Sequence, residues 1–327
     1  MRKWNHSLDL MVRTCERRAF LRSHFGCSTA KKDSPRYKAF LVGQALDLPA
    51  WHGRLVHAAI HEWIIPPLRK GIWPDFLQVQ TQTLELAAKQ AEFSRLARYE
   101  LESANSTGLE YCVLRADLLG NGLSNEQFKE TESALSAALN VLEEEHLDLL
   151  ARVRHARKAY SEKALRFKLD DDIFIEAIID LMLCEPNGRC LIVDWKLWEH
   201  TDGTARDQLQ AYAFAVSACG WWPELKVDRF ELVEANLING DRITYSASDE
   251  VLAEVDDRIF NGVDKLTRVF ERPAKDCSPM DFSIADSPGA CQHCSVLEVC
   301  NGSVTSAQLE TNVLSLELFS IGRATGS

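Results

Sequence analysis

Long apolar runs are missing from this sequence of 327 residues. No stretch approaches the roughly 18 consecutive apolar residues that a membrane-spanning helix requires, so we expect no membrane partner. Residues 1–6 also lack the apolar segment and small-residue cleavage site of an export signal, from which we expect a cytoplasmic protein. The composition, with 46% hydrophobic and 26% charged residues, excludes a disordered or fibrous chain and is sufficient for a sizeable core.

Positive charge is scarce overall but concentrated at one end of the sequence. The 37 Lys and Arg residues against 48 Asp and Glu residues give a net charge of −11, which argues against a simple nucleic-acid coat. Residues 1–40, however, contain ten basic and three acidic residues and so carry +7, which leaves −18 for the other 287 residues. Because phosphate binding follows local charge, this segment is either a DNA-binding lobe or a solvated basic helix.

Two patterns of apolar spacing divide the chain. Helical spacing is found at residues 7–25, 53–63, 84–104, 124–168, 204–218 and 250–270. Short apolar runs typical of strands are found at residues 173–183, 190–195, 226–237 and 242–245. The second helix is expected to end before Pro66-Pro67, and Asn239-Gly240 predicts a tight hairpin. We therefore predict an α/β fold in which a central mixed β-sheet is flanked by helices and follows a large N-terminal helical region.

These boundaries predict a single domain over residues 1–302. Its helical part extends to about residue 168, its sheet core covers about 169–272, and a segment with three closely spaced cysteines covers 273–302. Residues 303–327 form a separate tail, whose apolar residues either pack on the body or dock a partner.

Three charged residues lie near the ends of the first two predicted strands. Asp180 is near the end of one strand, and Asp194 and Lys196 are at the end of the next. Two carboxylates at one end of a sheet form a hard-oxygen site suited to Mg²⁺ or Mn²⁺. A lysine beside them can orient or deprotonate a water molecule, or offset charge on a phosphate. An Asp-x-Lys segment alone is a weak signal, because ordinary strand ends often carry charges.

Two helical segments add to this set. Gln208 and Tyr212 are four residues apart and so share a helix face, and His57 lies four residues after Gly53. Each also has an ordinary interpretation, as core packing or, for His57 with His61, as half of a zinc site. The ordered set resembles the PD-(D/E)xK nuclease superfamily, specifically its RecB-like exonuclease branch, in His57, Asp180, Asp194-x-Lys196 and Gln208-x3-Tyr212.

The resemblance implies a deoxyribonuclease that uses one or two Mg²⁺ or Mn²⁺ ions. The implied metal ligands are His57, Asp180, Asp194 and the backbone carbonyl of Trp195, and the implied catalytic residues are Asp180, Asp194, Lys196, Gln208 and Tyr212. Lys196 would act at the attacking water. Glu162 lies where many members carry a further acidic residue, which implies a supporting role. The family usually has a glycine where this sequence has Ala177, which puts the local backbone geometry in doubt.

The cysteines provide a second signal. The C-terminal segment contains the spacing C-x2-C-x5-C in Cys291, Cys294 and Cys300. Three thiolates leave a tetrahedral metal or a cubane cluster one ligand short, and the candidate fourth is Cys15, with Cys27 and His293 as competitors. The surroundings of Cys15 resemble those in CRISPR-adaptation nucleases and the AddB nuclease domain, where four such cysteines hold a [4Fe–4S] cluster that joins the chain ends. A structural zinc site is the alternative.

We therefore expect an exonuclease that acts on single-stranded DNA or on DNA ends, in DNA repair, recombination or defence against phages and mobile elements. The basic residues expected to track the DNA backbone are Arg13, Arg17, Arg18 and Arg22. The alternative is a catalytically weak DNA-binding or scaffolding subunit that works with a helicase or another protein partner.

Overall fold

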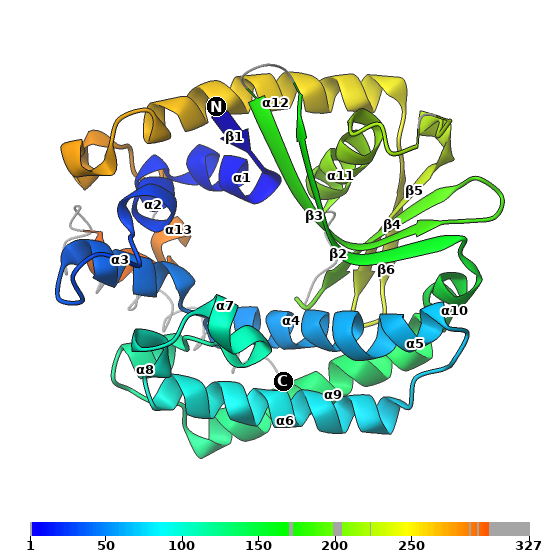
Figure 1. Cartoon of the computed structure of the whole chain (residues 1–327), viewed down its shortest axis with the longest axis horizontal. Coiled ribbons are helices and arrows are strands. Elements are labelled where there is room, and N and C mark those ends of the chain that lie inside the picture. The colour runs from blue at the N-terminus through cyan, green and yellow to red at the C-terminus, as the bar shows by residue number, and fades with distance from the viewer. Residues whose placement is uncertain are drawn as a thin grey trace, which may run out of the picture.

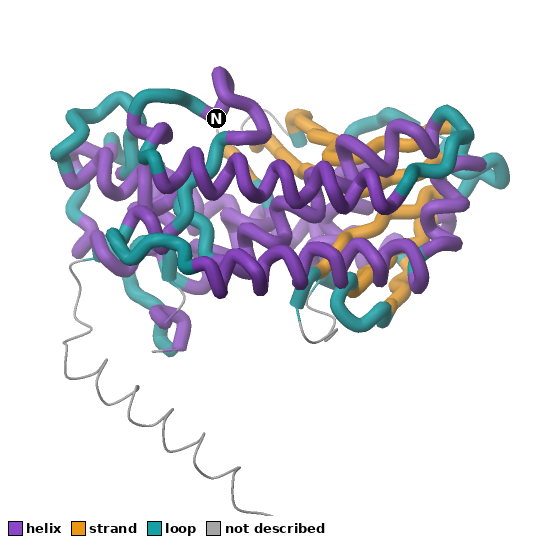
Figure 2. The backbone as a smooth tube through the Cα atoms, turned by 90° about the horizontal axis from the view of Figure 1, so that it is seen from below, coloured by secondary structure: helices purple, strands orange, loops and turns teal. Residues whose placement is uncertain are grey.

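The structure, a computed structural model, describes residues 2–169, 173–198, 205–222, 224–287, 289–292 and 294–300. The predicted tail at residues 303–327 and His293 lie outside these ranges. The molecule is elongated, with its strands gathered toward one end and long helices running along its length (Figure 2). Helix α12 (Asp249–Phe270) follows one long side, and α6 (Phe76–Arg95) and α9 (Asn125–Glu145) follow the opposite one (Figure 1).

A six-stranded mixed sheet forms the core (Figure 1). Its strands are β1 (Arg2–Trp4), β2 (Lys158–Lys168), β3 (Ile173–Cys184), β4 (Cys190–Lys196), β5 (Phe230–Asn236) and β6 (Arg242–Ser246). The order is β1-β3-β4-β5-β6, and β2 pairs with β3. β1 is parallel to β3 and β4 is parallel to β5, whereas the other pairs are antiparallel. The predicted mixed sheet with flanking helices is thus confirmed.

Strand β4 is buried along its whole length, as expected for a continuous apolar run with helices on both faces. Ile192 packs in a core with α11 (Arg206–Ala218) and α12. Leu191 and Val193 pack on the opposite face, in a core with α4 (Leu48–Ala59) and α9. The sheet therefore separates two apolar cores. Polar side chains on its strands lie between the two layers of helices that cover its faces.

The other helices surround this framework. They are α1 (His6–Thr14), α2 (Glu16–Phe20), α3 (Pro35–Gln44), α5 (Ile65–Arg69), α7 (Ala104–Thr107), α8 (Arg115–Leu118), α10 (Leu147–His155) and α13 (Gly289–Gln292). Side-chain caps start the long ones: Asp47 accepts from the Ala50 N–H at the start of α4, and Ser124 forms a capping box at the start of α9. The α13 segment lies beside α2 and α3, so the last described segment packs against helices from the first fifty residues (Figure 1).

The predicted helix over residues 124–168 is wrong in its last part, because residues 158–168 form strand β2. This strand pairs with β3 along its whole length. The backbone hydrogen bonds of β2 are formed with β3, which comes later in the chain. Strand pairing of this kind outweighs the helical spacing of the apolar residues in the segment. Strand β1 likewise lies within the region expected to be helical.

Two helices begin or end at other residues than the sequence predicts. Residues 7–25 divide at Cys15, which is extended, ends α1 and begins α2, and accepts from the Arg18 N–H at 3.4 Å through its sulfur. The helix expected to end before Pro66-Pro67 continues through a π-helical turn, Ile60–Ile64, into α5. The prolines occupy the first turn of α5, where a missing N–H donor costs little.

Candidate active site

The two aspartates of the predicted site lie where β3 and β4 separate. The ladder between these strands ends at the Leu181–Val193 pair. Beyond it, the Trp195 backbone N–H donates to Oδ2 of Asp180 at 3.0 Å. Strand β4 continues to pair with β5 as far as Lys196, so the backbone that carries Asp194 and Lys196 stays fixed after it leaves β3.

Glu162 enters the site from β2, across from Asp180. The pairs Ser161–Leu181 and Lys163–Ile179 flank this position in the ladder. Glu162 has a φ of 49°, which is uncommon for a residue other than glycine and redirects its side chain. The alternation of β3 reverses at the same level, because Ile179 packs in the α11 core and Leu181 in the α4 core. The distorted pair of strands thus marks the position of the site.

His57, on α4, completes a group of three residues. Its Nδ1 lies 3.2 Å from Oε1 of Glu162 and 3.7 Å from Oδ2 of Asp180, and its Nε2 lies 3.2 Å from the Trp195 carbonyl oxygen. One ligand atom from each of the three side chains lies within 4.8 Å of the others. An imidazole, two carboxylates and a nearby carbonyl fit a divalent cation such as Mg²⁺ or Mn²⁺.

This group contains Glu162 where the sequence predicts Asp194. The Asp194 carboxylate is 1% exposed, and its Oδ2 lies 2.5 Å from Nζ of Lys196. The sequence indicates only a supporting role for Glu162, because the helical spacing around this residue does not predict that it lies close to Asp180. The one local signal was a polar segment, Ser161-Glu162-Lys163, within an otherwise mixed run.

Burial and neighbouring charges shift the pKa values of these groups. Burial opposes the charge on His57, but the Asp180 and Glu162 carboxylates outweigh this effect and raise the pKa of His57 to about 9. Burial, together with the negative charge of Asp180, raises the pKa of Asp194 to about 7 against the opposing effect of Lys196. Burial also raises the pKa of Asp180, and His57 offsets part of this shift. Carboxylates held this close repel each other, and a bound cation would relieve that repulsion.

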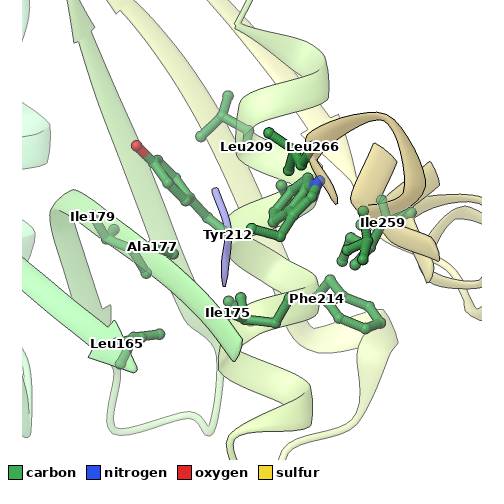
Figure 3. Close-up of a cluster of buried hydrophobic side chains, with 14 of the residues drawn as sticks. Leu165, Ile175, Ala177, Ile179, Leu209, Tyr212, Phe214, Ile259 and Leu266 are labelled. Carbon is green, nitrogen blue, oxygen red and sulfur yellow. The ribbon is translucent and has the colours of Figure 1, made fainter. Parts of the chain in front are cut away.

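Lys196 begins a chain of polar contacts that leads into α11. Beside its ion pair with Asp194, Nζ of Lys196 donates to Oε1 of Gln208 at 3.0 Å. Nε2 of Gln208 donates in turn to the Tyr212 hydroxyl at 2.6 Å. The Tyr212 ring packs among apolar residues that include Leu209, and its hydroxyl points away from them (Figure 3). The apolar core therefore holds Tyr212, and Tyr212 and Gln208 hold the lysine.

A family model for the PD-(D/E)XK nuclease superfamily matches residues 11–301, a range that includes every group of this site. The chain belongs to this superfamily. As a PD-(D/E)XK protein it is a metal-dependent nuclease, a hydrolase that cleaves phosphodiester bonds, and its His57, Glu162 and Asp180 are suited to the metal. No helix in the described part of this nuclease combines the length and the apolar character needed to cross a membrane.

Two solved structures resemble this PD-(D/E)XK nuclease at low similarity. The structure titled SSO0001 has 15% identity and a TM-score of 0.31, and the match covers 54% of this chain and 79% of that one. A protein from Eubacterium rectale that is provisionally named an exonuclease has 11% identity and a TM-score of 0.31, over 81% of this chain and 92% of that one. No curated protein matches the chain. The family assignment accordingly rests on the family model.

The four arginines predicted to track DNA have different environments. Arg17 is 6% exposed, and its guanidinium donates to the Phe282 carbonyl oxygen through Nε at 3.3 Å and Nη2 at 3.2 Å. Arg17 therefore joins α2 to the C-terminal segment, and its guanidinium is not available to a DNA phosphate. Arg13 is exposed but pairs with the buried Asp9 at 3.0 Å. Arg22 lines a cavity between α1 and α12, and Arg18 lines a pocket that also contains cysteines.

All four predicted cluster ligands line that second pocket, together with apolar side chains. They are Cys15, Cys291, Cys294 and Cys300. The competitor Cys27 lies in the loop after α2, where its sulfur is 3.3 Å from Oγ1 of Thr29. His61, the possible zinc partner of His57, instead has its Nδ1 2.9 Å from the Ser161 hydroxyl.

Proposed function

We propose that this PD-(D/E)XK nuclease is a RecB-like exonuclease that uses Mg²⁺ or Mn²⁺ to hydrolyse single-stranded DNA or DNA ends. The observation that carries the proposal is the proximity of two centres. One is the His57–Glu162–Asp180 group, whose ligand atoms lie within 4.8 Å of one another. The other is Lys196, which the Trp195–Asp180 hydrogen bond holds beside it on β4.

The side chains divide the work of hydrolysis. His57, Glu162, Asp180 and the Trp195 carbonyl would hold a divalent cation, which would supply Lewis-acid chemistry toward a phosphate and a water molecule. Asp194 orients the Lys196 ammonium through an ion pair of 2.5 Å, and Gln208 restricts it from the other side. Lys196 then positions the water for in-line attack and offsets the negative charge that develops on the phosphate. Asp194, which the resemblance implies as a metal ligand, stays a further candidate for that role.

We propose a [4Fe–4S] cluster for the cysteine pocket. Four thiolates are the complete ligand set of such a cluster, and the pocket brings together Cys15 and the three C-terminal cysteines. A tetrahedral zinc site with the same four ligands is the alternative.

The exposed part of the basic segment supports DNA as the substrate. Arg22 is exposed and Arg18 lines the cysteine pocket, whereas Arg13 and Lys3 are exposed but paired with Asp9 and Glu176. Their local positive charge can attract a phosphate backbone to an otherwise acidic protein. We place this activity in DNA repair, recombination or defence against mobile elements, in which free DNA ends are the substrates.

The test is cleavage of end-labelled single- and double-stranded DNA by anaerobically purified protein. We expect Mg²⁺- or Mn²⁺-dependent cleavage by the parent, and a rate at least about 100-fold lower for Lys196→Ala, since a positioned proton-transfer group contributes this much. Lys89→Ala, at an exposed lysine on α6, is the matched control and should cleave at the parent rate.

Removal of the Lys196 ammonium leaves the Asp194 carboxylate buried without its partner, which destabilises the fold. The variant Lys196→Gln and the unfolding temperature of each variant therefore distinguish a loss of catalysis from a loss of folding. Cleavage by a folded Lys196→Ala variant at the parent rate would refute the assignment. A parent protein that binds DNA tightly but does not cut it would support a scaffolding subunit instead.

A further inference from the structure

An exposed tryptophan lies against the proposed catalytic lysine. Trp198 lies two residues beyond the end of β4 and is 42% exposed. Nζ of Lys196 lies 4.6 Å from the centre of its indole ring. The Trp198 backbone carbonyl accepts from Nδ2 of Asn236 at 2.9 Å, and Asn236 is fully buried at the end of β5. The backbone of Trp198 is therefore anchored to the sheet, although its side chain is exposed.

The Trp198 side chain combines a contact with Lys196 and exposed surface. The ammonium of Lys196 lies over one face, a favourable cation–π arrangement. With close to half of its surface exposed, the ring retains apolar area that protein atoms do not cover. A flat, anchored aromatic surface of this kind is what unpaired nucleobases stack on. Bases inside a duplex are already stacked on both sides and cannot use it without being unpaired.

We propose that Trp198 stacks on the base next to the phosphate that is cleaved and thereby selects unpaired strands. The inference rests on the proposed function, because Lys196 marks the position of the reacting phosphate. With Nζ of Lys196 4.6 Å from the indole and 2.5 Å from Asp194, a base on Trp198 belongs to a nucleotide beside the catalytic groups. Trp198 is thus a binding residue that links strand recognition to the position of cleavage.

The experiment compares two end-labelled single strands of equal length, one intact and one with abasic sites near the end that is cut. Dissociation constants are measured by fluorescence anisotropy in EDTA, and kcat and KM are measured with Mg²⁺. The proteins are the parent, Trp198→Ala, Trp198→Phe and, as control, Trp73→Ala. Trp73 is similarly exposed, at 41%, and lies in the connection between α5 and α6.

We expect the parent and Trp73→Ala to prefer the intact strand by roughly tenfold in Kd and KM, since stacking on one aromatic residue has effects of this size. Trp198→Ala should lose that preference by weakening only the intact strand, and Trp198→Phe should keep most of it. A parent without preference would overturn the proposal. So would a Trp198→Ala variant that lowers kcat equally on both strands at unchanged Kd, because Trp198 would then act only through Lys196. If the parent cuts neither strand, the proposed nuclease function fails, while the Kd comparison still decides whether Trp198 stacks on bases.

Discussion

The two polar centres of this nuclease are held in different ways. The active site lies between two helical layers, and its side chains contact one another, as in the His57–Glu162 and Lys196–Gln208 pairs. The cysteine pocket is built from short segments at the two ends of the described chain, and of its four thiols only Cys294 is buried. Contacts between side chains hold the geometry of the active site, whereas the proposed cluster would hold that of the cysteine pocket.

The two ends of the described chain also contact each other directly. The Arg17 N–H donates to the Ser283 carbonyl oxygen at 3.0 Å, the Arg17 guanidinium donates to the Phe282 carbonyl oxygen, and the Phe20 and Phe282 rings stack at 4.3 Å. A hydrogen bond of this kind contributes about 1 kcal/mol net. Metal binding coupled to folding contributes roughly 10–16 kcal/mol in small zinc domains, so a bound group at the cysteine pocket would add to the stability that these contacts provide.

The largest expected effect comes from breaking the cysteine pocket. Cys294→Ser should lose iron and visible absorbance and should be destabilised by more than about 3 kcal/mol, seen as a lower unfolding temperature and a lower soluble yield, because the cluster no longer joins the chain ends. Cys27→Ser is the matched control and should keep the iron and stability of the parent. A Cys294→Ser protein with parental stability and activity would contradict the proposed role of the pocket.

A smaller and more selective effect is expected at the active site. Glu162→Gln removes one anionic group from the His57–Glu162–Asp180 group while the neighbouring hydrogen bonds and the fold remain. The metal concentration for half-maximal cleavage should rise at least roughly tenfold, since ligand charge sets cation affinity. Iron content and unfolding temperature should stay at parental values, as should all properties of Glu143→Gln, an exposed control at the end of α9. Unchanged metal dependence in Glu162→Gln would return Glu162 to the supporting role expected from the sequence.

The smallest effect concerns His6, which helps to hold the N-terminal segment and lies apart from the cysteine pocket in sequence. Burial, reinforced by Arg258, lowers the pKa of His6 from 6.5 to about 4. His6 is therefore neutral in the folded protein, and the unfolded chain takes up its proton first as the pH falls below 6.5. Stability should be lost between about pH 6.5 and pH 4, and this one group should cost on the order of 1–2 kcal/mol by pH 5.

His6→Gln should lose less stability than the parent when urea unfolding at pH 7.5 is compared with unfolding at pH 5. An identical loss in both proteins would show that His6 is not buried in its neutral form. The iron content of both proteins should be measured at each pH, so that release of the cluster is not mistaken for titration of His6.

By itself the sequence determined the chemistry available and the class of fold. The helical spacing of Gln208 and Tyr212, the strand ending in Asp194-x-Lys196 and the separate strand with Asp180 are local patterns. Local patterns can be read from the sequence because backbone periodicity depends on neighbouring residues. The order of these segments then pointed to the PD-(D/E)XK superfamily, which the family model confirms.

Only the tertiary structure decided which of these groups meet. Glu162 joins His57 and Asp180 because β2 pairs with β3, and the left-handed backbone at Glu162 directs its side chain into the site. Arg17 is buried rather than available to DNA because its guanidinium contacts the Phe282 carbonyl, 265 positions along the chain. Contacts of this kind depend on strand pairing and packing between segments that are remote in sequence, and these interactions override local propensity.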